Sequence, residues 1–303
     1  MTVVIGIFGP TASGKSAVAE AIAGRIPADL VSADAMQVYR DLPLLTNQST
    51  HPSRLVGIWA LEHEASVGEY APLAHAAIDE ILATGRTPVV VGGTGLYLRA
   101  ALADLSLPPA PEAGARERWA GLYDAEGPEA AHERLRGLDP GAARAVHAND
   151  RRRVVRALEL AEAGDSLAPD RNTPDRSRLW AEETRHPTVI VGLDLPKDVV
   201  ERRIEARTRG MFDAGVEEEA RRALAGTLSA TARKTMGLDE LATLPREEAI
   251  AALVARTRRY AAYQRKWMRR IPGLVMVEAD RPPGEIADDI VALARTRERL
   301  SRR

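Results

Sequence analysis

The residues best suited to chemistry form one stretch near the N-terminus, Gly9-Pro10-Thr11-Ala12-Ser13-Gly14-Lys15-Ser16. This stretch fits the Walker A pattern, G-x-x-x-x-G-K-[ST], at every fixed position. In such a loop the backbone N–H groups surround a phosphate, the lysine adds a positive charge, and the last hydroxyl is a ligand for the Mg²⁺ that the phosphates share. We therefore predict a site for a phosphate or diphosphate, with Ser16 as a ligand of Mg²⁺.

The sequence on either side of this loop predicts the elements that must position it. Residues 3–8 are apolar and mostly β-branched, which is typical of a buried strand, and residues 17–25 favour a helix. A strand, a glycine-rich loop and a helix in this order direct several N–H groups and a helix N-terminus at one anion.

Two further predicted strands end in polar residues. Asp34 follows a short strand predicted over 29–33, and Thr94 follows the run 88–91 after two glycines. Sheets of this class build their sites beyond the carboxyl ends of their strands, so both side chains are candidates for the site. For Asp34 an ordinary N-cap is the alternative, and a Gly-Gly-Thr-Gly turn alone is weak evidence.

Two polar side chains lie at helical spacing among apolar residues. Arg207 falls on the stripe formed by Val200, Ile204 and Met211, and a buried arginine requires an anion. Gln264 lies on the inner face of a helix predicted over 248–271. The other side of that helix carries four cations, suited to an RNA backbone or to solvent: Arg256, Arg259, Lys266 and Arg270.

Composition limits the class of protein. The chain has 303 residues, no cysteine, and 42 Lys and Arg against 43 Asp and Glu, a net charge of −1 that argues neither for nor against nucleic acid. The absence of cysteine excludes disulfides and thiolate metal sites. The first strand begins within a few residues of Met1, and no apolar run approaches about 18 residues. We expect a cytoplasmic enzyme without a signal peptide.

The middle of the chain differs from both ends. Pro108-Pro109-Ala110-Pro111 is a stiff break, residues 112–163 have a helical pattern without a strand signal, and strand character returns at 189–193. We predict an α/β fold with a parallel sheet flanked by helices, formed by residues 1–110 and 188–303. An all-helical domain, residues 111–187, is inserted in it.

Several motifs together resemble the tRNA dimethylallyltransferases, also called tRNA isopentenyltransferases. The N-terminal ones are GPTASGKS, SAD-x-x-QVYR and VVVGGTGLYLRA. Residues 149–159 resemble the family's NDxxRxxRALE segment, 203–215 its RIxxRxxxMxxxG helix, and 259–267 its RxYAxxQxxW helix. The resemblance runs from residue 5 to about residue 269.

The resemblance implies a P-loop NTPase-like core and an RNA-binding insertion. It implies transfer of a dimethylallyl group from dimethylallyl diphosphate to the exocyclic N6 amine of the adenosine 3′ of the anticodon in tRNA, with Mg²⁺. We expect a monomer. Asp34 would be the general base, assisted by Thr94, and residues 9–16 with Arg207 would bind the diphosphate. The residues expected along the tRNA are Asp34, Ala35, Met36, Gln37, Thr94, Arg116, Arg152, Arg153, Val154, Val155, Arg156 and Gln264.

The chain departs from the family pattern in four places. The family's GTAKP-like turn is replaced at 45–49, its PHHLxD segment around 56–61, and the lysine of its IGYKE turn by Asp239. In its YAKRQ segment the two basic positions are Ala262 and Tyr263. Several of these positions are basic in the family or near the RNA. The departures therefore affect the part of the predicted site that binds tRNA more than the part that binds the diphosphate.

Three alternatives remain open at this point. An adenylate isopentenyltransferase would perform the same chemistry on free AMP or ADP, without need of an inserted domain. A P-loop kinase or NTPase would use the same loop for ATP, but would leave Arg207 and Gln264 unexplained. An RNA-binding relative without catalytic activity is the third. Turnover on AMP, ATP and an anticodon stem-loop distinguishes them.

Overall fold

The computed structural model describes residues 3–105, 107, 112, 114–168, 179 and 181–301. The chain forms two compact units, Met1–Asp104 with Leu179–Arg303, and Leu105–Arg178. The predicted break at 108–111 and much of the predicted connection over 164–187 lie outside the described residues. The larger unit begins again at Leu179, nine residues before the predicted position 188. Buried Arg99 donates hydrogen bonds to the carbonyls of Leu179 and Ala181 there.

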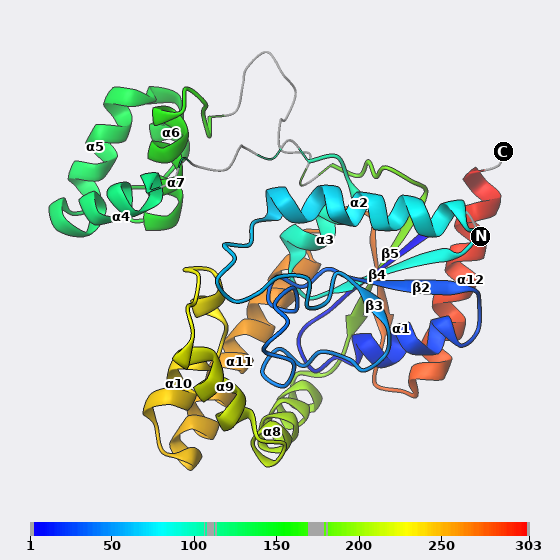
Figure 1. Cartoon of the computed structure of the whole chain (residues 1–303). Coiled ribbons are helices and arrows are strands. Elements are labelled where there is room, and N and C mark those ends of the chain that lie inside the picture. The colour runs from blue at the N-terminus through cyan, green and yellow to red at the C-terminus, as the bar shows by residue number, and fades with distance from the viewer. Residues whose placement is uncertain are drawn as a thin grey trace. The chain divides into compact units, whose positions relative to one another are not determined.

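Six parallel strands form the sheet of the larger unit, in the order β3-β2-β4-β1-β5-β6 (Figure 1). They are β1 (Val4–Phe8), β2 (Ala28–Ser32), β3 (Ser53–Arg54), β4 (Thr87–Gly92), β5 (Thr188–Asp194) and β6 (Leu274–Glu278). The central strands are continuous apolar runs because helices cover the sheet on both faces. This is the predicted fold class.

Eight α-helices and one 3₁₀-helix complete the described part of the larger unit. They are α1 (Lys15–Ala23), α2 (Val67–Ala83), α3 (Gly95–Leu102), α8 (Lys197–Asp213), α9 (Val216–Ala225), η1 (Ala232–Lys234), α10 (Leu238–Thr243), α11 (Arg246–Met268) and α12 (Pro283–Ser301). Helix α1 packs on α12 and α2 packs on α3, with α1 and α2 on opposite sides of the sheet (Figure 1).

The smaller unit is helical throughout its described residues. It contains α4 (Ala115–Glu126), α5 (Pro128–Leu138), α6 (Pro140–Ala145) and α7 (Arg151–Glu162). Its own core includes Leu135, Val154 and Leu158. Helix α7 begins at an aspartate cap, where the Asp150 carboxylate accepts a hydrogen bond from Arg153 N–H (3.2 Å).

The alignment of strand ends positions the site. Strand β4 lies between β2 and β1, and the register pairs Phe8 with Gly92 and Ser32 with Val91. The three strands therefore end side by side. The Walker loop, Asp34 and Thr94 leave the sheet at the same edge, as the sequence predicts.

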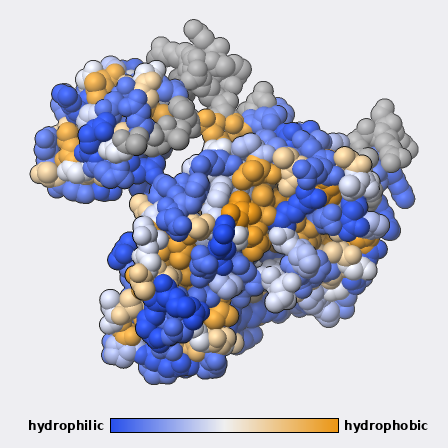
Figure 2. Space-filling view, in the orientation of Figure 1, coloured by the Kyte–Doolittle hydropathy of each residue, from blue (hydrophilic) through white to orange (hydrophobic). Residues whose placement is uncertain are grey.

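The surface of both units is largely hydrophilic, with a hydrophobic area near the middle of the larger one (Figure 2). Among the described residues, none of the helices is both long and apolar enough to cross a membrane.

Candidate active site

The Walker loop has the backbone geometry of an anion site. Ala12 (φ +63°) and Gly14 (φ +89°) adopt the left-handed conformation, and α1 begins at Lys15. Left-handed residues in such a loop turn successive N–H groups toward a common point, forming an anion nest. A left-handed alanine is strained, and such strain is characteristic of functional loops.

Lys15 lies folded against its own loop. Its ammonium donates to the carbonyls of Gly9 (3.0 Å) and Pro10 (2.8 Å). Burial lowers the pKa of Lys15 to about 8; the negative charge of Asp34 opposes this shift, and the positive charge of Arg207 adds to it. Lys15, Asp34 and Arg207 therefore lie close enough to influence one another's charge.

Two buried polar atoms beside the loop have no hydrogen-bond partner among the described residues. They are Nε of Arg207 and Oγ of Ser13. Burial also lowers the pKa of Arg207, with Asp34 opposing the shift. Buried donors of this kind require an acceptor, and a diphosphate between Lys15 and Arg207 would supply both the acceptors and the neutralising charge.

The residues also fit a magnesium ion held mainly by phosphate. The described residues contain no group of three or more His, Cys, Asp or Glu able to hold a metal. Ser16, in the first turn of α1, offers one hydroxyl. Mg²⁺ keeps several waters and binds readily through one or two protein groups and the phosphates of a substrate, so Ser16 with a diphosphate is a suitable donor set.

Asp34 and Thr94 are joined through the turn that follows β2. The Asp34 carboxylate accepts a hydrogen bond from Met36 N–H with Oδ1 (3.0 Å), and the Thr94 hydroxyl accepts one from Ala35 N–H (3.3 Å). No helix follows Asp34, so the N-cap alternative does not apply. Its other carboxylate oxygen, Oδ2, makes no hydrogen bond within the described ranges.

Gln264 connects the Walker loop to the Gly-Gly-Thr-Gly turn. Its Oε1 accepts a hydrogen bond from Thr11 N–H (2.7 Å), and its Nε2 donates to the Gly93 carbonyl (2.9 Å). The side chain is 2% exposed. Both ends of the amide are thus occupied by backbone, and the predicted contact of Gln264 with tRNA gives way to a role in positioning the loops.

The glycines of the Gly-Gly-Thr-Gly turn are explained by what packs on them. A Cβ on Gly93 would lie 2.2 Å from Nε2 of Gln264, and one on Gly95 would lie 2.1 Å from the Trp267 ring. Real Cβ atoms do not approach so closely, so a side chain at Gly95 would require the Trp267 ring to move, and one at Gly93 would displace the Gln264 amide from its hydrogen bonds. Side chains of α11 thus pack on both glycines that flank Thr94, and this packing positions Thr94.

Tyr260 belongs to this group of residues, although it was not among the predicted site residues. Burial raises the pKa of its hydroxyl to about 12, the charge of Asp34 adds to the shift, and hydrogen bonding with Thr94 and Gln264 opposes it. In the sequence Tyr260 is part of the RxYAxxQxxW motif, which gives no sign of its proximity to Thr94.

The predicted RNA-facing arginines of α7 and its neighbour fall into two kinds. Arg116 and Arg156 both bind the buried carboxylate of Glu159 (3.0 and 2.9 Å). Arg152 and Arg153 are exposed, and neither forms an ion pair within the described residues. The second pair is the one available to a phosphate.

Val154 and Val155 correct the prediction for α7. Their side chains are 0% and 5% exposed and belong to the core of the smaller unit. The helix presents its arginines on one side and these valines on the other, so a contact with tRNA through the two valine side chains is excluded by packing.

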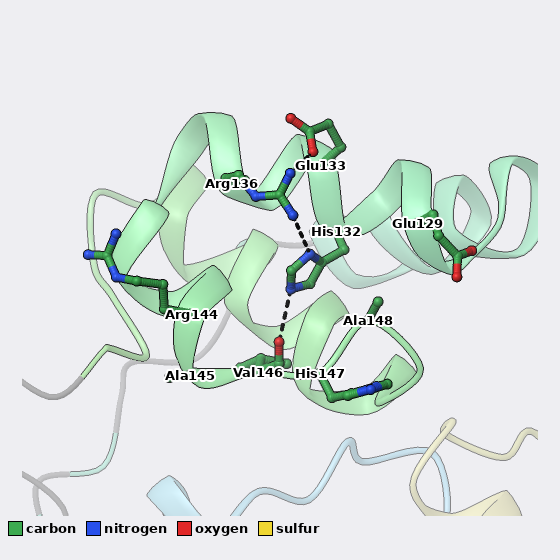
Figure 3. A pocket seen from close by; sticks show the side chains of 9 residues that line it. All are labelled: Glu129, His132, Glu133, Arg136, Arg144, Ala145, Val146, His147 and Ala148. Carbon is green, nitrogen blue, oxygen red and sulfur yellow. Dashed lines mark hydrogen bonds and ion pairs between the residues drawn. The ribbon is translucent and has the colours of Figure 1, made fainter.

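The smaller unit also contains an open cavity of about 550 Å³, lined by residues of α5, α6 and the loop before α7 (Figure 3). At its centre, Nε2 of His132 lies 2.9 Å from the Val146 carbonyl and 3.0 Å from the Ala143 carbonyl. Since carbonyls only accept, this nitrogen carries the proton, and His132 holds two chain segments together. None of the predicted site residues lines this cavity.

Comparison with known proteins identifies the family. Residues 37–271 match the family model described as IPP transferase. The chain belongs to the IPP transferase family.

Relatives in this family match almost the whole chain. A tRNA dimethylallyltransferase of Corynebacterium jeikeium is 36% identical over 292 residues, 92% of this chain and 92% of the relative. One of Streptomyces coelicolor is 38% identical over 282 residues, 89% and 88% of the two chains. Neither name describes a kinase or an enzyme of free adenylate, so the tRNA hypothesis is favoured over both alternatives.

Solved structures of the family share the fold. The full-length tRNA isopentenylpyrophosphate transferase of Bacillus halodurans is 28% identical with a TM-score of 0.70, and the match covers 100% of both chains. A eukaryotic dimethylallyltransferase acting on tRNA, 23% identical, has a TM-score of 0.77 over 100% of this chain and 80% of its own. Both matches extend over the whole of this chain.

Proposed function

We propose that the protein transfers a dimethylallyl group from dimethylallyl diphosphate to the N6 amine of the adenosine 3′ of the anticodon in tRNA, releasing diphosphate. The names of relatives that match nine tenths of the chain support the reaction class. The observation that carries the assignment of roles is that one carboxylate, Asp34, lies within electrostatic reach of the two buried cations Lys15 and Arg207.

Asp34 is the proposed general base. The amine lone pair of adenosine is delocalised into the purine ring, so the nitrogen is a weak nucleophile until it loses a proton. As N6 bonds to the allylic carbon, its proton passes to the Asp34 carboxylate. The Thr94 hydroxyl accepts a hydrogen bond from the N–H of Ala35, the residue next to Asp34. It orients the amine.

The Walker loop stabilises the leaving group. Breaking the allylic C–O bond leaves its electron pair on the diphosphate. The amides of residues 11–16, the Lys15 ammonium and the Arg207 guanidinium would bind that negative charge in a site they already occupy before reaction. Mg²⁺, held by Ser16 and the phosphates, would supply further charge neutralisation.

The target base must leave the anticodon loop stack to reach Asp34, because the amine is not accessible while stacked. The exposed Arg152 and Arg153 are proposed to bind tRNA phosphates. All proposed groups come from one chain, so a monomer suffices, and a tRNA substrate implies action in the cytoplasm.

The test is incubation with dimethylallyl diphosphate, Mg²⁺ and an anticodon stem-loop that carries adenosine 3′ of the anticodon, followed by nucleoside mass analysis. We expect one C5H8 group on that adenosine, and none when guanosine replaces it. Prenylation of free AMP with no reaction on the stem-loop, or phosphoryl transfer from ATP, would contradict the proposal.

A further inference from the structure

Helix α11 carries a row of three aromatic side chains beside the site, and the middle one, Tyr263, is exposed. The Tyr263 side chain is 55% exposed, an unusual state for a large aromatic residue. Its ring stacks on Tyr260, with centroids 6.4 Å apart and planes at 24°. It meets Trp267 edge to face, with centroids 6.5 Å apart and planes at 68°.

Both ends of this row are anchored at the turn that carries Thr94. Tyr260 interacts with the Thr94 side chain, and the Trp267 ring is packed so closely on Gly95 that no Cβ fits between them. Tyr263 stands between these two anchored rings. The Tyr263 ring thus contacts two rings that pack at this turn, while about half of its own surface is open to solvent.

Two cations flank Tyr263 on the same side of the helix. Arg259 and Lys266 precede and follow it by four and three residues, the spacings that place side chains on one helical face. Both are exposed, and neither forms an ion pair within the part of the chain that the structure describes. Their neighbour Arg258 differs, since it pairs with Glu205 (3.6 Å).

We propose that Tyr263 stacks on an unpaired base of the anticodon loop next to the target adenosine, and that Arg259 and Lys266 bind the phosphates on either side of that base. An aromatic ring between free cations is the arrangement that binds single-stranded nucleic acid, because every base has a face to stack and every nucleotide a phosphate. The inference rests on the proposed function and adds a subsite to it.

Other occupants fit the row less well. The dimethylallyl tail needs a site closed to water, which a ring with half its surface in solvent does not provide. A protein partner would be expected to bury a broader apolar area than a single exposed tyrosine offers. The free cations next to the ring favour a polyanion.

The main test compares Tyr263→Ala with Tyr263→Phe in steady-state prenylation of the stem-loop. Alanine removes the stacking surface and should raise the KM for the stem-loop about 5- to 100-fold, the range for loss of one base–aromatic stack. Phenylalanine keeps the ring and should stay within about twofold of the wild type. The KM for dimethylallyl diphosphate should be unchanged in both variants.

Met276→Ala is the matched control, because Met276 is 48% exposed on β6 and outside this row. A second arm measures salt dependence: Arg259→Ala and Lys266→Ala should each lower the slope of log affinity against log salt by about one. The paired Arg258→Ala should not change it.

The outcomes separate the inference from the proposed function. A Tyr263→Ala enzyme with a stem-loop KM within twofold of the wild type overturns the inference while the function stands. An equal rise in both KM values also overturns it, because the ring would then serve the donor. If the wild-type enzyme does not prenylate the stem-loop, both the inference and the proposed function are wrong.

Discussion

The phosphate loop and helix α7 both present positive charge, but they hold it in opposite ways. Lys15 and Arg207 lie in a buried setting that lowers the pKa of each, and polar atoms beside them lack partners. Arg152 and Arg153 stand exposed on α7. The first arrangement is prepared for one anion at one place, and the second for a polyanion whose phosphates can bind in several registers.

This difference predicts how each region responds to mutation. In the buried region a single side chain has no substitute, so its removal should be costly and insensitive to salt. In the exposed region each charge contributes a small share, which salt screens. Substitutions that produced equal effects in both regions would show that the distinction is wrong.

The largest effect is expected at the phosphate loop. Lys15→Met removes a charge directed at the leaving group and should lower kcat/KM for dimethylallyl diphosphate about 10²- to 10³-fold, the usual cost of one such donor. Stopped-flow or steady-state kinetics with a saturating stem-loop measures it. A loss below about fivefold would mean that the lysine does not face the diphosphate.

The lowered pKa of Lys15 gives this region a pH dependence. Since the free lysine loses its proton near pH 8, affinity for dimethylallyl diphosphate should be full below that pH and fall above it, by at most about tenfold per unit. Equilibrium binding from pH 6.5 to 9.5 tests this. The fall should disappear in Lys15→Met, and its persistence there would assign it to another group.

A smaller effect is expected at Gln264, which acts through the loops. Gln264→Ala leaves Thr11 N–H and the Gly93 carbonyl without partners and should destabilise the protein by about 1–3 kcal/mol, while raising the KM for dimethylallyl diphosphate. His132→Ala is the control: it breaks two hydrogen bonds to carbonyls in the smaller unit, so it should lower Tm without changing that KM. Equal KM values in both variants would make Gln264 purely structural.

The smallest effect is expected on α7. Arg152→Ala should raise the KM for tRNA a few fold and flatten its dependence on salt by about one phosphate contact, with no change in the KM for dimethylallyl diphosphate. Arg151→Ala, which removes an arginine already paired with Asp124 (2.5 Å), should change tRNA binding less. The reverse order would refute the assignment of Arg152 to RNA.

The sequence predicts the local part of this account well. The Walker loop and the aspartate at a strand end are consecutive features, and their convergence follows from a parallel sheet. The four strands predicted above agree with β1, β2, β4 and β5 within one or two residues, whereas the two-residue β3 was missed because a strand so short has no periodicity. Arg207 was identified from helical phase alone.

Long-range packing was not predictable from the sequence. Gln264 meets partners 253 and 171 residues away in the chain, so its position among apolar residues revealed burial but not its bonds. Val154 and Val155 were assigned to RNA because they lie within an arginine-rich motif, whereas the fold buries them. The proximity of Tyr260 to Thr94, and the stacking of Tyr263 on Tyr260, likewise depend on packing between distant segments.

The proposed mechanism is tested most directly at Asp34, which is proposed to take the proton from N6 of the acceptor as that nitrogen bonds to the donor's allylic carbon. In Asp34→Ala, single-turnover transfer to the stem-loop should fall about 10²- to 10⁴-fold, the usual contribution of a general base, while binding of dimethylallyl diphosphate stays near that of the wild type. Turnover that survives within tenfold would show that another group removes the proton and would contradict the mechanism.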